Sequence, residues 1–146
     1  MSSLRVRDVM TRYVEFLEPT ATVQDAAALM GELDVGGLPI GDASSLEGVI
    51  TDRDILYRVV ARGLSTTTDV RSVMSQPVVT CRDDDALQMV IDAMAAHHIR
   101  RMAVLSTEGN VAGWITLADI SRRLLVESHR LQETLRDLTE AEAVEA

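Results

Sequence analysis

The residues best suited to bind a ligand lie between Gly48 and Asp54, in the stretch Gly-Val-Ile-Thr-Asp-Arg-Asp. The pattern predicts that a short apolar strand ends here and that a helix follows, with Thr51 as its N-cap. Backbone N–H groups and the helix dipole favour an anion at such a helix N-terminus. Arg53 adds a guanidinium and Asp54 a carboxylate at the same place. The stretch therefore indicates a place to hold an anionic ligand.

The same pattern recurs between Gly113 and Asp119 as Gly-Trp-Ile-Thr-Leu-Ala-Asp. The repetition extends along most of the chain: Val73 and Met74 repeat Val9 and Met10 at an offset of 64 residues. Past the second hairpin turn the offset becomes 65, which one inserted turn residue explains. A long constant offset indicates an internal duplication.

The polar residues of both copies also have a purely structural interpretation. Each threonine can simply cap a helix, and each aspartate can simply favour the dipole of the first turn. Alternatively, a carboxylate with two acceptor oxygens binds both hydroxyls of a ribose diol. For either copy alone the two interpretations are equally weighted. Arg53, replaced in the second copy by a non-ionic residue, favours ligand binding in the first copy.

This asymmetry predicts a principal site at Thr51, Arg53 and Asp54, and a weaker or empty site at Thr116 and Asp119. Arg100 and Arg101 are candidates for further phosphate contacts. At least as ordinary is the alternative that they are exposed strand residues whose charge balances that of Asp83 to Asp85.

Each copy is expected to form strand, helix, strand, strand, helix, after a short helical lead-in. In the first copy we expect an extended segment around Val14 to Leu17, a helix capped by Thr22, and an end of the last helix at Gly63. The paired glycines Gly36 and Gly37 allow a close backbone approach, and Pro39 restricts its segment to an edge or irregular strand. The fold class is therefore α/β (α+β), with two pseudo-twofold repeats packed face to face because each alone is small. The expected segments are 4–63 for the first repeat, 64–68 for a linker, 69–126 for the second repeat and 127–146 for a helical extension.

The extension carries an apolar stripe at helical spacing, with six acidic residues and two arginines. It is either a solvated amphipathic tail or a helix that packs on a second subunit.

Composition narrows the class of protein. The 146 residues are 47% hydrophobic and 25% charged, as in an ordinary soluble globular chain, and the net charge of −9 disfavours general nucleic-acid binding. One cysteine, Cys81, permits no internal disulfide. No apolar run approaches the roughly 20 residues of a membrane helix, and no signal-peptide core is evident. We expect a cytoplasmic protein without membrane or nucleic-acid partners.

The duplicated motifs resemble tandem cystathionine β-synthase (CBS) domains, of the small stand-alone bacterial type. The resemblance rests on the Asp-Val-Met and Ser-Val-Met openings, the Leu-Pro-Ile and Met-Ala-Val strands and the Gly-x-Ile-Thr-x-x-Asp turns, and it covers roughly residues 4 to 126. It implies two clefts, a homodimer formed through the CBS modules and an adenosine ligand such as AMP, ADP, ATP or S-adenosylmethionine. The ligand-binding residues expected from the motifs and this resemblance are Thr51, Arg53, Asp54, Thr116, Asp119, Gly37, Leu38, Pro39, Val14, Arg100 and Arg101.

Three functions are then in competition. The first is an adenosine-nucleotide sensor in which the ligand changes module packing or partner binding, with no cofactor required. The second is a constitutive dimeric adaptor whose C-terminal helix recruits a protein partner, with vestigial clefts. An enzyme is disfavoured because no catalytic constellation is visible, and a metal site because His97 and His98 have no ligands at suitable spacing.

Overall fold

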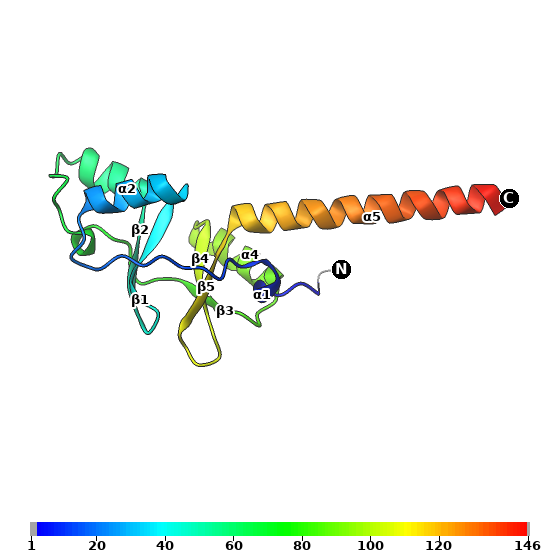
Figure 1. Cartoon of the computed structure of the whole chain (residues 1–146), viewed down its shortest axis with the longest axis horizontal. Helices are drawn as coiled ribbons and strands as arrows, with labels where there is room; N and C mark the ends of the chain where they lie inside the picture. Colours follow the sequence, from blue (N-terminus) through cyan, green and yellow to red (C-terminus); the bar gives the residue numbers. More distant parts are fainter. Residues whose placement is uncertain (1–2, 146) are drawn as a thin grey trace.

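The computed structural model describes the backbone of residues 3–145 and the side chains of residues 3–139. Two small α/β units lie side by side, and a long helix projects away from them (Figure 1). Among the described residues, no helix combines the length and the apolar character needed to cross a bilayer.

The first unit contains one helix, a β-hairpin and a second helical segment. Thr22 caps α2 as predicted: its hydroxyl accepts the N–H of Asp25, and the side chain of Asp25 accepts the N–H of Thr22. The elements are α2 (Val23–Leu33), β1 (Gly37–Asp42), β2 (Ser45–Thr51), α3 (Asp52–Ile55) and a π-helical turn η1 (Leu56–Val60). Gly63, predicted to end this helix, has a φ of 67°, which favours glycine.

The second unit repeats this order with a longer sheet. It contains β3 (Thr80–Arg82), α4 (Leu87–His97), β4 (Arg101–Leu105), β5 (Val111–Thr116) and α5 (Leu117–Glu145). Strand β4 pairs in parallel with β3 and antiparallel with β5. Asp34 and His98, 64 residues apart, end α2 and α4 in the same left-handed conformation. The expected fold class and its extended C-terminal helix are confirmed.

The strand predicted around residues 14–17 is reduced to one bridge between Leu17 and Ile40. The N–H of Leu17 donates to the carbonyl of Pro39, and that of Gly41 to the carbonyl of Leu17. Proline has no N–H to donate, so the parallel ladder cannot continue through Pro39. In the second repeat Ala103 takes the proline's position, and β3 pairs there over three residues.

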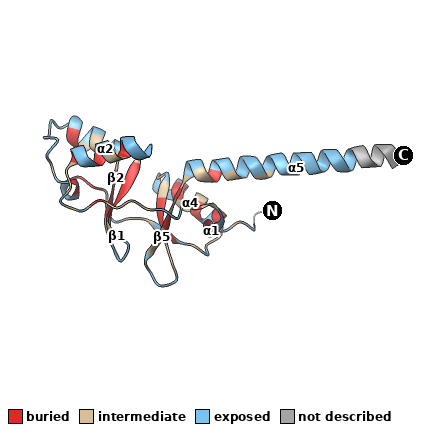
Figure 2. Ribbon diagram, in the orientation of Figure 1, coloured by how far each residue is buried: buried red, intermediate tan, exposed pale blue. Residues whose placement is uncertain are grey.

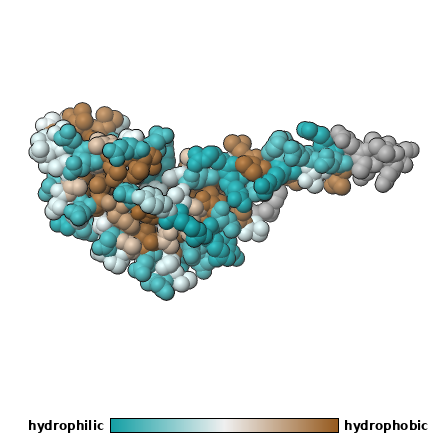
Figure 3. Space-filling view, in the orientation of Figure 1, coloured by the Kyte–Doolittle hydropathy of each residue, from teal (hydrophilic) through white to brown (hydrophobic). Residues whose placement is uncertain are grey.

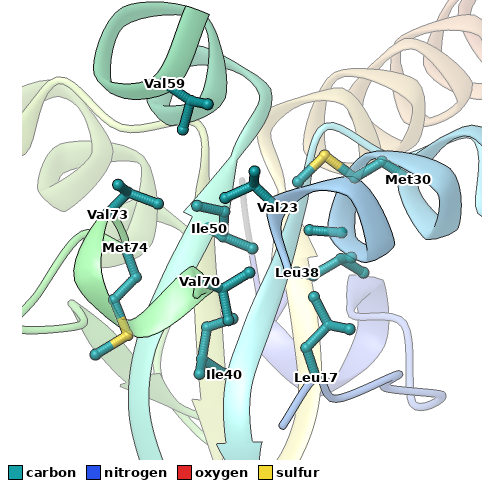
Figure 4. Packing of buried hydrophobic residues seen from close by; sticks show 11 residues of the cluster. Leu17, Val23, Met30, Leu38, Ile40, Ile50, Val59, Val70, Val73 and Met74 are labelled. Atoms are coloured by element: carbon teal, nitrogen blue, oxygen red, sulfur yellow. The ribbon is translucent and has the colours of Figure 1, made fainter. Parts of the chain in front are cut away.

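The helical lead-ins are exchanged between the repeats. The first, α1 (Val6–Val9), contributes Val6 to the hydrophobic core of the second repeat. The second, the 3-10 turn η2 (Val70–Ser72), leads into Val73 and Met74, which pack in the core of the first repeat (Figure 4). Because each core requires a segment from the other half of the chain, we expect the two repeats to unfold together.

Gly48 and Gly113, which open the two motifs, lie where the exchanged lead-ins pass. A Cβ at Gly48 would lie 2.5 Å from Met74 Sδ, and one at Gly113 would lie 2.6 Å from the carbonyl oxygen of Thr11. Real Cβ atoms do not approach so closely. The contact at Gly113 is with backbone, so that position needs glycine, whereas a Cβ at Gly48 would require the Met74 side chain to shift.

The sheets bury large side chains on one face and small ones on the other. Leu38, Ile40, Met102 and Val104 point into the two cores, as the period of two requires. The intervening Pro39 and Ala103 are buried but belong to neither core, which fits a face-to-face contact between the repeats. Backbone bonds also join them, such as Val111 N–H to the carbonyl of Ala43 at 2.8 Å.

Candidate functional site

A cleft of about 460 Å³ lies between the two repeats. The first repeat contributes residues before α2, the end of α2 and the start of β1, and the second contributes β4, the end of β5 and the start of α5. The lining residues are Thr11, Tyr13, Val14, Glu15, Leu33, Asp34, Val35, Gly36, Gly37, Leu38, Pro39, Arg101, Trp114, Thr116, Ala118, Asp119 and Arg122.

Asp119 is held at the start of α5 with one carboxylate oxygen near solvent. Its N–H donates to Thr116 Oγ1 at 3.1 Å, and its Oδ2 accepts the N–H of Thr116 at 3.3 Å. Its Oδ1 pairs with Arg122, whose side chain is 71% exposed. An ion pair with so exposed a partner contributes little stability, so a ligand can replace it.

Asp54, the equivalent residue of the first repeat, is satisfied from within the protein. Its Oδ2 accepts the N–H of Thr51 at 3.0 Å and its Oδ1 accepts the hydroxyl of Ser75 at 2.9 Å. Arg58 Nε lies 3.8 Å from the same Oδ1, and the Asp54 side chain is only 9% exposed. Both carboxylate oxygens are therefore in use.

Arg101 crosses from β4 to the first repeat and lies over Gly36 and Gly37. A Cβ on Gly37 would overlap Nη1 of Arg101, which explains the close approach that the paired glycines predict. Burial lowers the pKa of Arg101, and the charge of Asp52 partly opposes this effect. Nη1 is buried without a hydrogen-bond partner among the residues that the structure describes. An unpaired N–H of a cation is costly to bury, so this group would gain from an acceptor.

Two aromatic side chains of the cleft, Tyr13 and Trp114, were not among the predicted site residues. The chain has four aromatic residues in all, and half of them line this cleft. Tyr13 is 71% exposed and its hydroxyl donates to Glu15, which raises the pKa of the phenol. Aromatic residues are scarce in this chain, and that scarcity was the signal in the sequence that could have identified Tyr13 and Trp114. Arg122 was also missed, although it lies one helical turn beyond Asp119 on α5.

The predicted site residues separate into two groups. The cleft brings together Val14, Gly37, Leu38, Pro39, Arg101, Thr116 and Asp119. The others, Thr51, Arg53, Asp54 and Arg100, do not line it. The Arg53 guanidinium lies 5.4 Å from the ring centroid of Tyr57, in a cation–π contact, and Arg100 is exposed. The geometry thus favours the second copy of the motif, whereas the sequence argument ranked the first copy higher.

A second cavity, of about 560 Å³, lies between the two hairpin turns and the segment before β3. Glu47 is its one charged residue among those that line it, and this carboxylate pairs with Arg71 at 2.9 Å. The cavity therefore offers an anionic ligand no free cation.

The chain belongs to the CBS domain family: the family model matches residues 6–61 and 70–126. The predicted resemblance is thus confirmed for both copies.

Three similar proteins illustrate the family. The CBS domain-containing protein YhcV of Bacillus subtilis is 36% identical over 116 residues, which cover 80% of this chain and 82% of YhcV. A crystal structure of Hypoxic Response Protein I with two coordinated zinc ions has a TM-score of 0.71 at 34% identity, covering 82% of this chain and 98% of that one. The CBS domain protein PAE2072 from Pyrobaculum aerophilum, complexed with AMP, has a TM-score of 0.76 at 26% identity, covering 85% and 97%.

Proposed function

We propose that this chain is a regulatory module, not an enzyme, and that it binds an adenosine nucleotide in the cleft lined by Thr116 and Asp119. The observation that carries the proposal is that this one cleft contains a half-open carboxylate, two aromatic rings and a guanidinium whose buried Nη1 has no hydrogen-bond partner among the described residues. Such groups match a ribose diol, a phosphate and a purine. The AMP complex of PAE2072 supports the choice of ligand class.

Each part of the nucleotide has a specific partner in this proposal. Asp119 accepts the ribose hydroxyls, and Thr116 keeps its carboxylate in place. Arg101 Nη1 donates to the phosphate, assisted by Arg122 once that guanidinium leaves Asp119. The adenine ring stacks on Tyr13 or Trp114 beside Val14. In this proposal the principal site is therefore the cleft lined by Thr116 and Asp119. The turn at Thr51, Arg53 and Asp54 is not the principal site, because Asp54 already binds Ser75 and Thr51.

Regulation would follow from the position of the cleft between the repeats. Val14 and Gly37 come from the first repeat, and Thr116 and Asp119 from the second. A ligand that touches both stabilises one arrangement of the repeats relative to others, and only such a difference in affinity can shift a conformational equilibrium.

Thermal unfolding with and without nucleotide tests the proposal. AMP, ADP, ATP and S-adenosylmethionine are each titrated, and we expect a saturable rise of Tm for at least one of them. The 2′-deoxy form of that ligand should give a smaller rise, because Asp119 then accepts one hydroxyl fewer. A flat response to all four would refute the nucleotide proposal and leave the adaptor hypothesis.

The predicted homodimer through the CBS modules stays part of this proposal. Three large apolar side chains on η1, namely Leu56, Tyr57 and Val60, are 53% to 65% exposed and offer a surface for it. The zinc ions of Hypoxic Response Protein I are not extended to this chain. Among its described residues, no three His, Cys, Asp or Glu side chains gather as a metal site.

A further inference from the structure

Helix α5 continues far beyond the surface on which it packs. Its first turns lie against β5 and α1, and Ile120 is buried in the core of the second repeat. Farther along, the helix projects from the two repeats, and its described residues are mostly exposed (Figures 1 and 2). A helix without tertiary contacts is only marginally stable in water, so a partner surface would stabilise this segment.

Four of the six exposed leucines of α5 follow a seven-residue repeat. Leu117, Leu124, Leu131 and Leu138 are each 40% to 58% exposed. The positions between them on the same face are Ser121, Ser128 and Leu135. Alternating steps of four and three residues are typical of the seam of a left-handed coiled coil. Apolar patches are visible on the otherwise hydrophilic surface of the projecting helix (Figure 3). The spacing identifies the kind of occupant as another helix.

We propose that α5 pairs with the α5 of a second copy of this chain in an antiparallel coiled coil. This proposal does not depend on ligand binding, and the contact differs from a dimer made through the CBS modules.

The charge along α5 is complementary to itself in one antiparallel register. Residues 122–128 contain two arginines and one glutamate, whereas residues 131–137 contain two acidic residues and one arginine. Antiparallel pairing with residue 128 of one helix beside residue 131 of the other places these two segments, of opposite net charge, side by side. Parallel pairing would place each segment beside a copy of itself, with the same net charge, which disfavours association.

The seam residues are also complementary in this direction. In an antiparallel pair each leucine of the seven-residue repeat faces an intermediate position of the other helix. With residue 129 of one helix beside residue 130 of the other, each layer contains at least one leucine. The layers pair Ser121 with Leu138, Leu124 with Leu135, and Ser128 with Leu131 of the second copy. Parallel pairing would instead stack Ser121 on Ser121 and Ser128 on Ser128, which buries hydroxyls against each other.

Disulfide trapping between two variants of the full chain tests both the contact and its direction. Ser121→Cys carrying an affinity tag is mixed with untagged Leu138→Cys and oxidised. We expect a cross-link between the two different chains. Each new cysteine lies 17 residues along the helix from its own counterpart, about 25 Å at 1.5 Å per residue. Cross-links only between identical variants, as a parallel pair would give, or no cross-link at all, would overturn the proposal.

The native cysteine does not interfere with this test, because Cys81 is buried and burial raises its pKa to about 12. The wild-type chain, oxidised in parallel, is the control.

Adding Leu131→Glu to both variants should reduce the mixed cross-link at least about tenfold, because a charge then enters the central layers. Val126→Glu is the matched control. Val126 and Leu131 are similarly exposed, at 47% and 43%, but Val126 lies on the opposite side of α5, away from the seam. An equal loss in both variants would show that the contact does not use the leucine seam and would overturn the proposed register.

Discussion

The two strand-to-helix turns of this chain, Gly48–Asp54 and Gly113–Asp119, form the same hydrogen bonds within themselves. In each, the threonine hydroxyl accepts the N–H of the aspartate, and the carboxylate accepts the N–H of the threonine. They differ in what reaches the other carboxylate oxygen. Ser75 binds that oxygen of Asp54, whereas exposed Arg122 binds that of Asp119. Identical local motifs can thus differ in their capacity to bind a ligand.

The exchanged lead-ins account for this difference. Ser75 and Thr11 are 64 residues apart and pair equivalently, Ser75 with Val49 and Thr11 with Trp114. The Ser75 hydroxyl turns to Asp54, while Thr11 lines the open cleft. Among the described residues, no hydrogen bond joins Thr11 to Asp119.

The largest expected effect is the loss of nucleotide binding in Asp119→Asn. The variant loses the charge-assisted bonds to the ribose hydroxyls, which corresponds to about a 10- to 100-fold weaker affinity for AMP. Titration calorimetry measures it. Asp54→Asn is the matched control and should retain the wild-type affinity. If Asp54→Asn weakens AMP binding and Asp119→Asn does not, the principal site is at Thr51, Arg53 and Asp54.

Replacement of Asp54 should reduce the stability of the protein more than replacement of Asp119, which is the reverse of the order expected for AMP affinity. Asp54→Ala leaves the Ser75 hydroxyl and the Thr51 N–H without their acceptor, so we expect the free energy of unfolding to fall by about 1–3 kcal/mol. Asp119→Ala removes a mostly exposed ion pair and should cost under about 1 kcal/mol beyond its capping contribution. Urea unfolding of both variants gives the difference. Equal losses would mean that burial of Asp54 contributes nothing beyond the shared cap.

A smaller effect is expected from the glycine that accommodates Arg101. Gly37→Ala displaces the guanidinium, which can rotate away, so AMP affinity should fall about 3- to 10-fold with little loss of stability. Gly31→Ala is its control. A Cβ at Gly31, inside α2, meets no atom within 4 Å, and this change should stabilise the protein by about 0.5–1 kcal/mol without affecting AMP. Unchanged AMP binding in Gly37→Ala would remove Arg101 from the site.

The smallest effect concerns the two cores, which differ at several matched positions, among them Leu17 in the first and Cys81 in the second. Burial raises the pKa of the Cys81 thiol to about 12. The reactive thiolate is therefore scarce at pH 8, and a thiol reagent should label native protein far more slowly than urea-unfolded protein. Comparable labelling rates would mean that the second core opens much more readily than its packing implies.

Much of the local structure could be predicted from the sequence. Thr22 as a cap, Gly63 as a terminator and the long final helix all follow from residue types at fixed short spacings, because helices are stabilised by contacts within four residues. The duplication was equally visible, since an offset between repeats does not depend on the fold. Pro39 indicated an irregular strand, and the loss of its ladder bond accounts for the shortened pairing at residues 14–17.

The composition of the cleft could be predicted only in part. Thr116, Asp119 and Gly37, which begins β1, were identified. Tyr13 and Trp114 were not, because only the bridge between Thr11 and Trp114 brings their two segments to one cleft. Nor did the sequence indicate that the Ser75 hydroxyl would donate a hydrogen bond to the Asp54 carboxylate. That contact spans 21 residues and depends on the lead-in crossing to the other repeat.

The sequence by itself therefore determined the family, the repeats, their caps and the residues of the two turn motifs. The tertiary structure alone decided which copy of the motif stays open, because the exchange of lead-ins brings Ser75 to one carboxylate and leaves the other with Arg122. Local patterns specify which groups are present at a turn, whereas their availability to a ligand depends on neighbours that are distant in sequence and brought close only by packing of the two cores.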